Sequence, residues 1–61
     1  MKMMTRKEMI TACIEDQVAH GIVKPERKEF QIKARLTGSF RMSYSECKRW
    51  YDDVFGGEEQ E

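Results

Sequence analysis

The sequence is poor in the residues and motifs that catalysis requires. It has one histidine and two cysteines among 61 residues, and it contains no G-x-S-x-G, P-loop, H-E-x-x-H or paired C-x-x-C motif. So short a chain also leaves little room to shape a desolvated pocket. We therefore expect a protein that is not an enzyme and that takes no small-molecule substrate.

Soft metal ligands are equally scarce, because only Cys13, His20 and Cys47 are available. They are scattered along the chain, whereas a structural zinc ion requires four ligands that usually come in close pairs. We therefore predict no metal and no cofactor. Both cysteines fall on the apolar faces of expected helices, which favours buried, reduced thiols over a disulfide.

Long apolar runs are absent as well. No stretch approaches the length of a transmembrane span, and the charged start Met-Lys-Met-Met-Thr-Arg-Lys-Glu lacks the apolar region of a signal peptide. These features predict a cytoplasmic protein without membrane association. The small size and the lack of catalytic motifs would also suit a phage or mobile-element gene.

An excess of charge of either sign is absent, since eleven basic and eleven acidic side chains give a net charge of zero. This balance argues against a general polyanion binder, and it leaves self-association open, including a homodimer. The charges are nevertheless uneven. Residues 24–49 hold eight basic and three acidic groups, a net of +5, whereas residues 50–61 hold five acidic groups and no basic ones.

Two segments carry complete signals for a helix. Thr5 with Glu8 and Ser43 with Glu46 have the spacing of capping boxes, in which hydroxyl and carboxylate bond the first backbone N–H groups. Apolar residues then recur at helical spacing over residues 5–20 and 44–55, and glycines follow both segments. The second segment contains the tryptophan and both tyrosines. We therefore expect it to be the helix that the rest of the chain covers.

The segment 25–37 carries conflicting signals. Pro25 at the start, acidic residues early, basic residues late and Gly38 at the end all indicate a helix. However, apolar and polar residues alternate over 29–36 and again over 40–43, which is typical of a β-hairpin. We favour the helix, because propensity, charge order and both end signals agree.

The sequence thus predicts an all-α fold, in which residues 1–56 form a single small domain of three helices at about 5–20, 25–37 and 44–55. An acidic tail at 57–61 contains no apolar residue and is expected to be disordered. The alternative is an α+β fold, a helix–hairpin–helix with strands near 29–36 and 40–43.

The residue types that dominate protein interfaces are concentrated in residues 40–51. Two short helices cannot cover Phe40, Met42 and Tyr44 together, so these three are candidates for a protein interface. Filling of the monomer core is the alternative for them. We predict a small intracellular binding protein, a regulator, adaptor or inhibitor, that contacts another protein or a second copy of itself.

A second hypothesis comes from the stretch between Ala34 and Trp50. The separation of Ala34 and Gly38, and the serine-rich helix start that leads to Lys-Arg-Trp, resemble the second half of a helix-turn-helix module. The connection is about three residues longer than is usual for such modules. The resemblance implies a DNA-binding accessory protein, whose candidate contacts to phosphates or bases are Arg35, Arg41, Ser43, Ser45, Lys48 and Arg49. The alternative is a capped surface helix with solvated basic residues.

Overall fold

Three α-helices follow one another in the computed structural model, which describes residues 3–56. They are α1 (Arg6–Ala19), α2 (Lys28–Thr37) and α3 (Tyr44–Tyr51). A 3₁₀ turn, η1 (Pro25–Arg27), precedes α2, and a π-helical turn, η2 (Asp52–Gly56), extends α3. The predicted small all-α fold is confirmed. The first helix is one residue shorter at each end than predicted, the predicted helix 25–37 consists of η1 and α2, and the predicted helix 44–55 consists of α3 and most of η2. The tail predicted at 57–61 lies outside the described residues.

Both predicted capping boxes are present. The Thr5 hydroxyl accepts the Glu8 N–H at 3.1 Å, and the Glu8 carboxylate accepts the Thr5 N–H at 2.8 Å. At the start of α3, the Ser43 hydroxyl accepts the Glu46 N–H at 3.2 Å, and the Glu46 carboxylate accepts the Ser43 N–H at 2.8 Å. Each box satisfies two backbone donors that a helix leaves without partners, so both helices begin where the sequence places them.

The glycines after α1 and α2 serve different purposes. Gly21 has a φ of +77°, the left-handed conformation that ends many helices. Gly38 instead has an extended backbone with φ −99° and ψ −150°. A Cβ atom there would lie 2.9 Å from the Cα of Ala34. Gly38 is therefore required because the chain passes close to the last turn of α2.

The hairpin alternative for residues 29–43 is wrong, since residues 3–56 contain no strand and this segment is mostly α2. In the helix, Ile32 is buried and Leu36, one turn later, packs against the same core. Phe30 lies on another side and is 58% exposed. The alternation of the sequence therefore produces a helix with one buried and one exposed apolar face.

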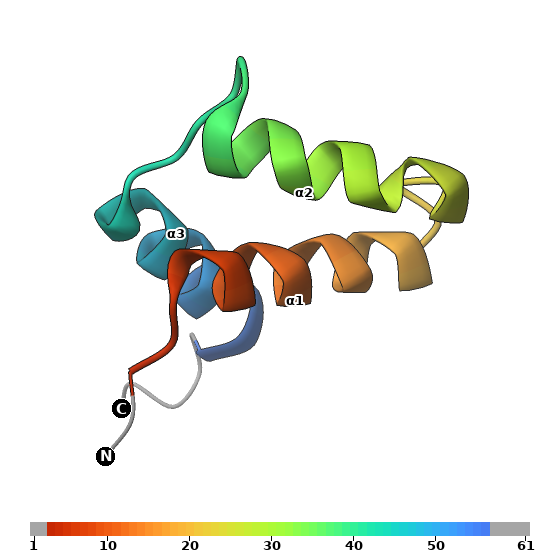
Figure 1. Cartoon of the computed structure of the whole chain (residues 1–61). Helices are drawn as coiled ribbons and strands as arrows, with labels where there is room; N and C mark the ends of the chain where they lie inside the picture. Colours follow the sequence, from red (N-terminus) through yellow and green to blue (C-terminus); the bar gives the residue numbers. More distant parts are fainter. Residues whose placement is uncertain (1–2, 57–61) are drawn as a thin grey trace.

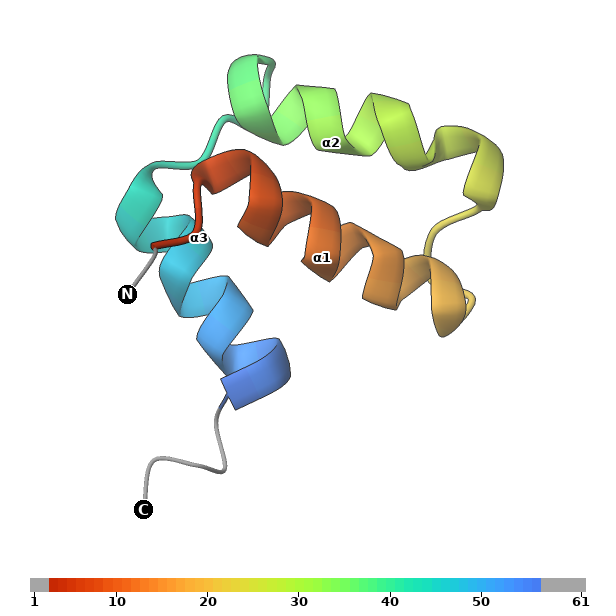
Figure 2. The same cartoon turned by 60° about the horizontal axis from the view of Figure 1, so that its bottom comes forward.

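Helix α1 lies between the other two helices (Figures 1 and 2). α2 runs antiparallel beside it, and α3 packs against it from another side. The buried side chains of the described residues are Met9, Ile10, Cys13, Ile14, Ile32 and Cys47. Four of the six belong to α1 and only Cys47 to α3. The expectation that the aromatic segment 44–55 is the central helix is therefore wrong.

Both cysteines are buried, as the sequence predicts, and they are free thiols. Burial, together with the negative charge of Asp16, raises the pKa of Cys13 from 9.0 to about 11. Burial also raises the pKa of Cys47, against an opposing effect of the Arg6 guanidinium. Both side chains therefore act as small apolar groups of the core. Within residues 3–56, no helix is long and apolar enough to cross a membrane.

Candidate functional site

The loop between α2 and α3 is fixed by an arginine from the other end of the chain. Arg6, in the first turn of α1, donates from Nε to the Met42 carbonyl at 2.9 Å and from Nη2 to the Leu36 carbonyl at 2.7 Å. Two backbone bonds add to this, from Met42 N–H to Arg35 O at 2.9 Å and from Arg41 N–H to Gly38 O at 3.2 Å. Because hydrogen bonds from a charged donor are the stronger ones, this Arg6 clamp gives the loop a defined conformation.

No motif of the sequence predicts a role for Arg6. One signal was available, because a cation in the first turn of a helix is unfavourable for the helix dipole. An arginine at such a position is explained when its guanidinium donates hydrogen bonds to acceptors outside the helix. Its acceptors lie 30 and 36 residues away, so no local pattern could identify them.

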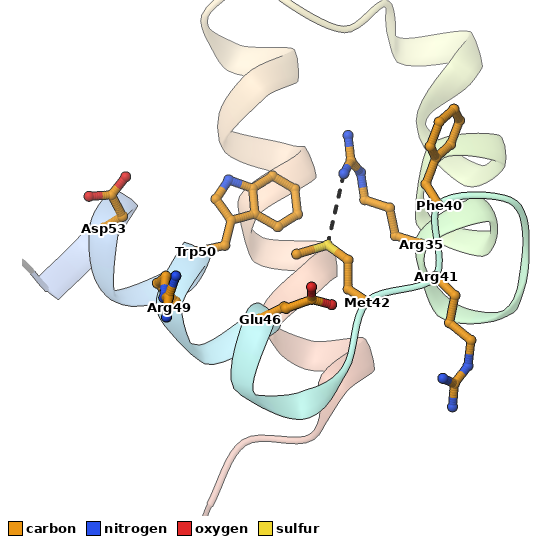
Figure 3. A pocket seen from close by; sticks show the side chains of 8 residues that line it. All are labelled: Arg35, Phe40, Arg41, Met42, Glu46, Arg49, Trp50 and Asp53. Carbon is orange, nitrogen blue, oxygen red and sulfur yellow. Dashed lines mark hydrogen bonds between the residues drawn. The ribbon is translucent and has the colours of Figure 1, made fainter.

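A groove of about 580 Å³ opens beside this clamped loop, between the end of α2 and one side of α3 (Figure 3). Its lining combines large apolar side chains with charged groups of both signs. The residues that line it are Arg35, Phe40, Arg41, Met42, Glu46, Arg49, Trp50 and Asp53.

Arg35 is held inside this groove. Its guanidinium carbon lies 4.8 Å from the centre of the Trp50 ring, a cation–π arrangement, and its Nη1 is 3.8 Å from the Met42 sulfur. Its Nε is buried and has no hydrogen-bond partner among the described residues. Arg35 therefore contributes a fixed positive charge to the floor of the groove.

Phe40 stands at the edge of the groove and is 62% exposed. It also lines a second hollow of about 270 Å³, together with Phe30 and Ala34 of α2. Phe40 is thus an aromatic ridge shared by two hollows. Met42, two residues later, is half-buried and packs against the core.

Tyr44 lies apart from the other two interface candidates. It is 37% exposed and lines a separate hollow with Met9, Lys48 and Tyr51. The structure therefore brings Phe40 and Met42 together at one groove and places Tyr44 at another site.

The nucleic-acid candidates are divided in the same way. Arg35, Arg41 and Arg49 line the groove, whereas Lys48 lines the hollow of Tyr44 and pairs with Asp52 at 3.1 Å.

The two serine candidates lie near the start of α3. The hydroxyl of Ser43 is occupied as the N-cap of α3, and Ser45 is exposed in its first turn. Of the candidate cations, three arginines therefore line one groove and Lys48 lines another hollow.

The side chains of Arg41 and Arg49 make no hydrogen bond or ion pair with any residue between 3 and 56. The two acidic residues of the groove differ from each other. Glu46 already accepts the Ser43 N–H, and Asp53 lies on the far side of Trp50 from Phe40 (Figure 3). Three arginines and two carboxylates line the groove, so its net charge is +1.

Comparisons of the chain with protein-family models, with curated proteins and with solved structures find no significant match. The function must accordingly be inferred from the groove itself. In the part of the chain that the structure describes, no three His, Cys, Asp or Glu side chains form a group that would hold a metal ion.

Proposed function

We propose that this chain is a small, non-enzymatic cytoplasmic binding protein, a regulator, adaptor or inhibitor, whose protein–protein interface is centred on Phe40. The observation that supports this best is an aromatic side chain, 62% exposed, on a loop that Arg6 ties to the last turn of α2 through the Met42 and Leu36 carbonyls. Exposed aromatic residues on mobile loops lose conformational entropy when they bind. On a clamped loop, most of this conformational entropy is already lost in the free protein, so binding loses less of it.

The surroundings of Phe40 also suit an interface. Aromatic residues, methionine and arginine are enriched at the centres of interfaces, and Trp50, Met42 and Arg35 lie beside Phe40 in the groove. A ridge between two hollows can fit between two side chains of a partner. These features favour recognition of a shaped protein surface.

Site-specific photocrosslinking in cells that express the chain tests this proposal. The photoreactive residue p-benzoylphenylalanine replaces Phe40 in one variant and Ile22 in the control. Ile22 is a matched position, because it is 69% exposed and lies in the connection between α1 and η1.

We expect a discrete protein adduct from position 40 that excess wild-type chain competes away. The variant Phe40→Ala should compete poorly. Identical adducts from both positions, or none from position 40, would contradict an interface centred on Phe40.

DNA binding is the second candidate, favoured by one observation: three arginines line the same groove. Against it, Glu46 and Asp53 line that groove too, and Lys48 is paired with Asp52. Titration of the ¹⁵N-labelled protein with a 20-base-pair duplex at low and moderate salt tests it. Shifts confined to residues 35–49 that fade as salt rises would support DNA binding, and an unchanged spectrum would reject it.

A further inference from the structure

We infer that the groove recognises a protein segment in which carboxylates flank a large apolar side chain. This inference rests on the proposed protein-binding function and specifies its partner. It follows from the charge of the groove, from the arginines that lack partners and from the position of the aromatic rings.

The charge of the groove is unevenly distributed. Phe40 and Arg41 extend from the loop in opposite directions, Arg35 points into the space between Phe40 and Trp50, and Asp53 lies beyond Trp50 (Figure 3). Glu46 bonds the Ser43 N–H at 2.8 Å and is thereby part of a helix cap. A ligand in the space between Phe40 and Trp50 therefore meets the Arg35 guanidinium, in a groove whose three arginines and two carboxylates leave a net charge of +1.

Arg41 and Arg49 are exposed, and their guanidinium groups make no hydrogen bond or ion pair with residues 3–56. They differ in this respect from Arg6, which bonds two carbonyls, and from Lys28, which pairs with Glu15 at 2.8 Å. A free guanidinium presents a planar fork of donors whose geometry matches a carboxylate. One arginine on the loop and one on α3 favour a ligand with two separated negative groups.

The apolar part of the ligand is specified by Phe40 and Trp50. Their rings lie on either side of the Arg35 guanidinium (Figure 3), and the guanidinium is stacked 4.8 Å from the Trp50 ring centre. The guanidinium occupies the space between the rings, so an apolar side chain of a ligand would lie over it, beside the exposed Phe40 ring. Duplex DNA would supply negative charge without such a side chain, and a small free anion would gain little from a groove that is open to solvent. A peptide segment satisfies both requirements.

Three fluorescein-labelled ten-residue peptides test the inference by fluorescence anisotropy at low salt. The first contains the core Asp-Glu-Phe-Leu-Asp-Glu, the second has Ser-Ser in place of Phe-Leu, and the third has Lys in place of each acidic residue. We expect the first peptide to bind at least fivefold more tightly than the second, and the third not to bind.

Paired variants locate the binding. Arg41→Ala combined with Arg49→Ala should weaken binding of the first peptide roughly fivefold, as expected for the loss of two exposed charge contacts. The control combines Lys7→Ala with Lys24→Ala, which removes the same charge from two exposed lysines outside the groove. Circular dichroism establishes that both variants remain folded.

Equal binding of all three peptides, equal weakening by the two double variants, or tighter binding of a 20-base-pair duplex would overturn the inference. The photocrosslinking result separates its failure from that of the proposed function. If position 40 yields a competed adduct while the first peptide does not bind, only the carboxylate chemistry is wrong. If both experiments fail, the protein-binding function is wrong as well.

Discussion

Helices α1 and α3 begin with the same device and have different surroundings. Both start with a capping box, but α1 contributes four buried side chains and α3 only one. α1 packs against both of the other helices, whereas one side of α3 lines the open groove. Capping thus determines where a helix begins, while the number of neighbouring helices determines how much of it is buried. We therefore expect the side chains of α1 to contribute most of the unfolding free energy. We expect α3 and the loop before it to contribute the binding surface.

The largest contrast should come from truncating an apolar side chain in each helical region. Ile14→Ala removes a fully buried group of α1 and should cost about 3 kcal/mol of unfolding free energy. Val54→Ala, at a position in η2 that is 37% exposed, should cost less than about 1 kcal/mol. Urea unfolding followed by circular dichroism measures both, and equal losses would contradict the division of roles.

Removal of the Arg6 clamp should have the next largest effect. Arg6→Ala leaves the Leu36 and Met42 carbonyls without their charged donor, and we expect a loss of about 2 kcal/mol in unfolding free energy. Lys7→Ala, the exposed neighbour, serves as the control and should change stability by less than about 0.5 kcal/mol. Hydrogen exchange of the Met42 amide should accelerate in the Arg6 variant alone. Unchanged exchange there would show that the loop does not depend on the clamp.

The two buried thiols should make stability depend on alkaline pH. The unfolded chain loses the Cys13 proton near pH 9.0, whereas folding raises the pKa of this thiol to about 11. The unfolded state therefore binds fewer protons between these values. The contribution of Cys13 is complete below about pH 8 and falls as pH rises to 11, by about 2 kcal/mol.

Urea unfolding between pH 7 and pH 11 tests this prediction with two matched variants. Cys13→Ala should flatten the pH dependence of the unfolding free energy more than Cys47→Ala does. The reason is that the Arg6 charge opposes the rise in the pKa of Cys47. Parallel curves for the wild type and Cys13→Ala would exclude this thiol as the cause.

The smallest effects should come from the two capping boxes. Thr5→Ala and Ser43→Ala should each cost about 1 kcal/mol. Because α1 holds most of the core, Thr5→Ala should accelerate hydrogen exchange throughout the described helices. Ser43→Ala should accelerate it mainly in the first turn of α3, where fraying exposes little buried surface. The same hydrogen-exchange pattern in both variants would contradict the expectation that α1 affects the whole fold and the start of α3 only its own first turn.

Much of the fold could be predicted because its signals are local. The capping boxes at Thr5 and Ser43, the left-handed Gly21 and the dipole-matched charges of residues 25–37 all act within a few residues. Alternation around Ile32 supported the wrong hairpin alternative, since a period of two also leaves residues four apart on one helix face.

The site was less predictable, because it depends on contacts between distant parts of the chain. The groove residues Phe40 and Met42 were identified from their type, but nothing local separates them from Tyr44, which faces another hollow. Arg35 is a candidate contact to phosphates or bases from the sequence, and only the packing of α3 reveals its stack on Trp50. The central position of α1 is likewise not evident from the sequence, because it depends on the number of neighbouring helices and not on aromatic content.

The Arg6 clamp also has a consequence for the order of folding. It joins the first turn of α1 to carbonyls 30 and 36 residues further along, and closing so long a loop delays a contact relative to helix formation. We expect a low φ-value at Arg6, so that its removal speeds unfolding more than it slows folding. During synthesis, the helix that carries the donor emerges first and the loop that carries Phe40 follows later. The ridge is therefore assembled only when the fold is nearly complete, and a partner that reads it would distinguish finished chains from unfinished ones.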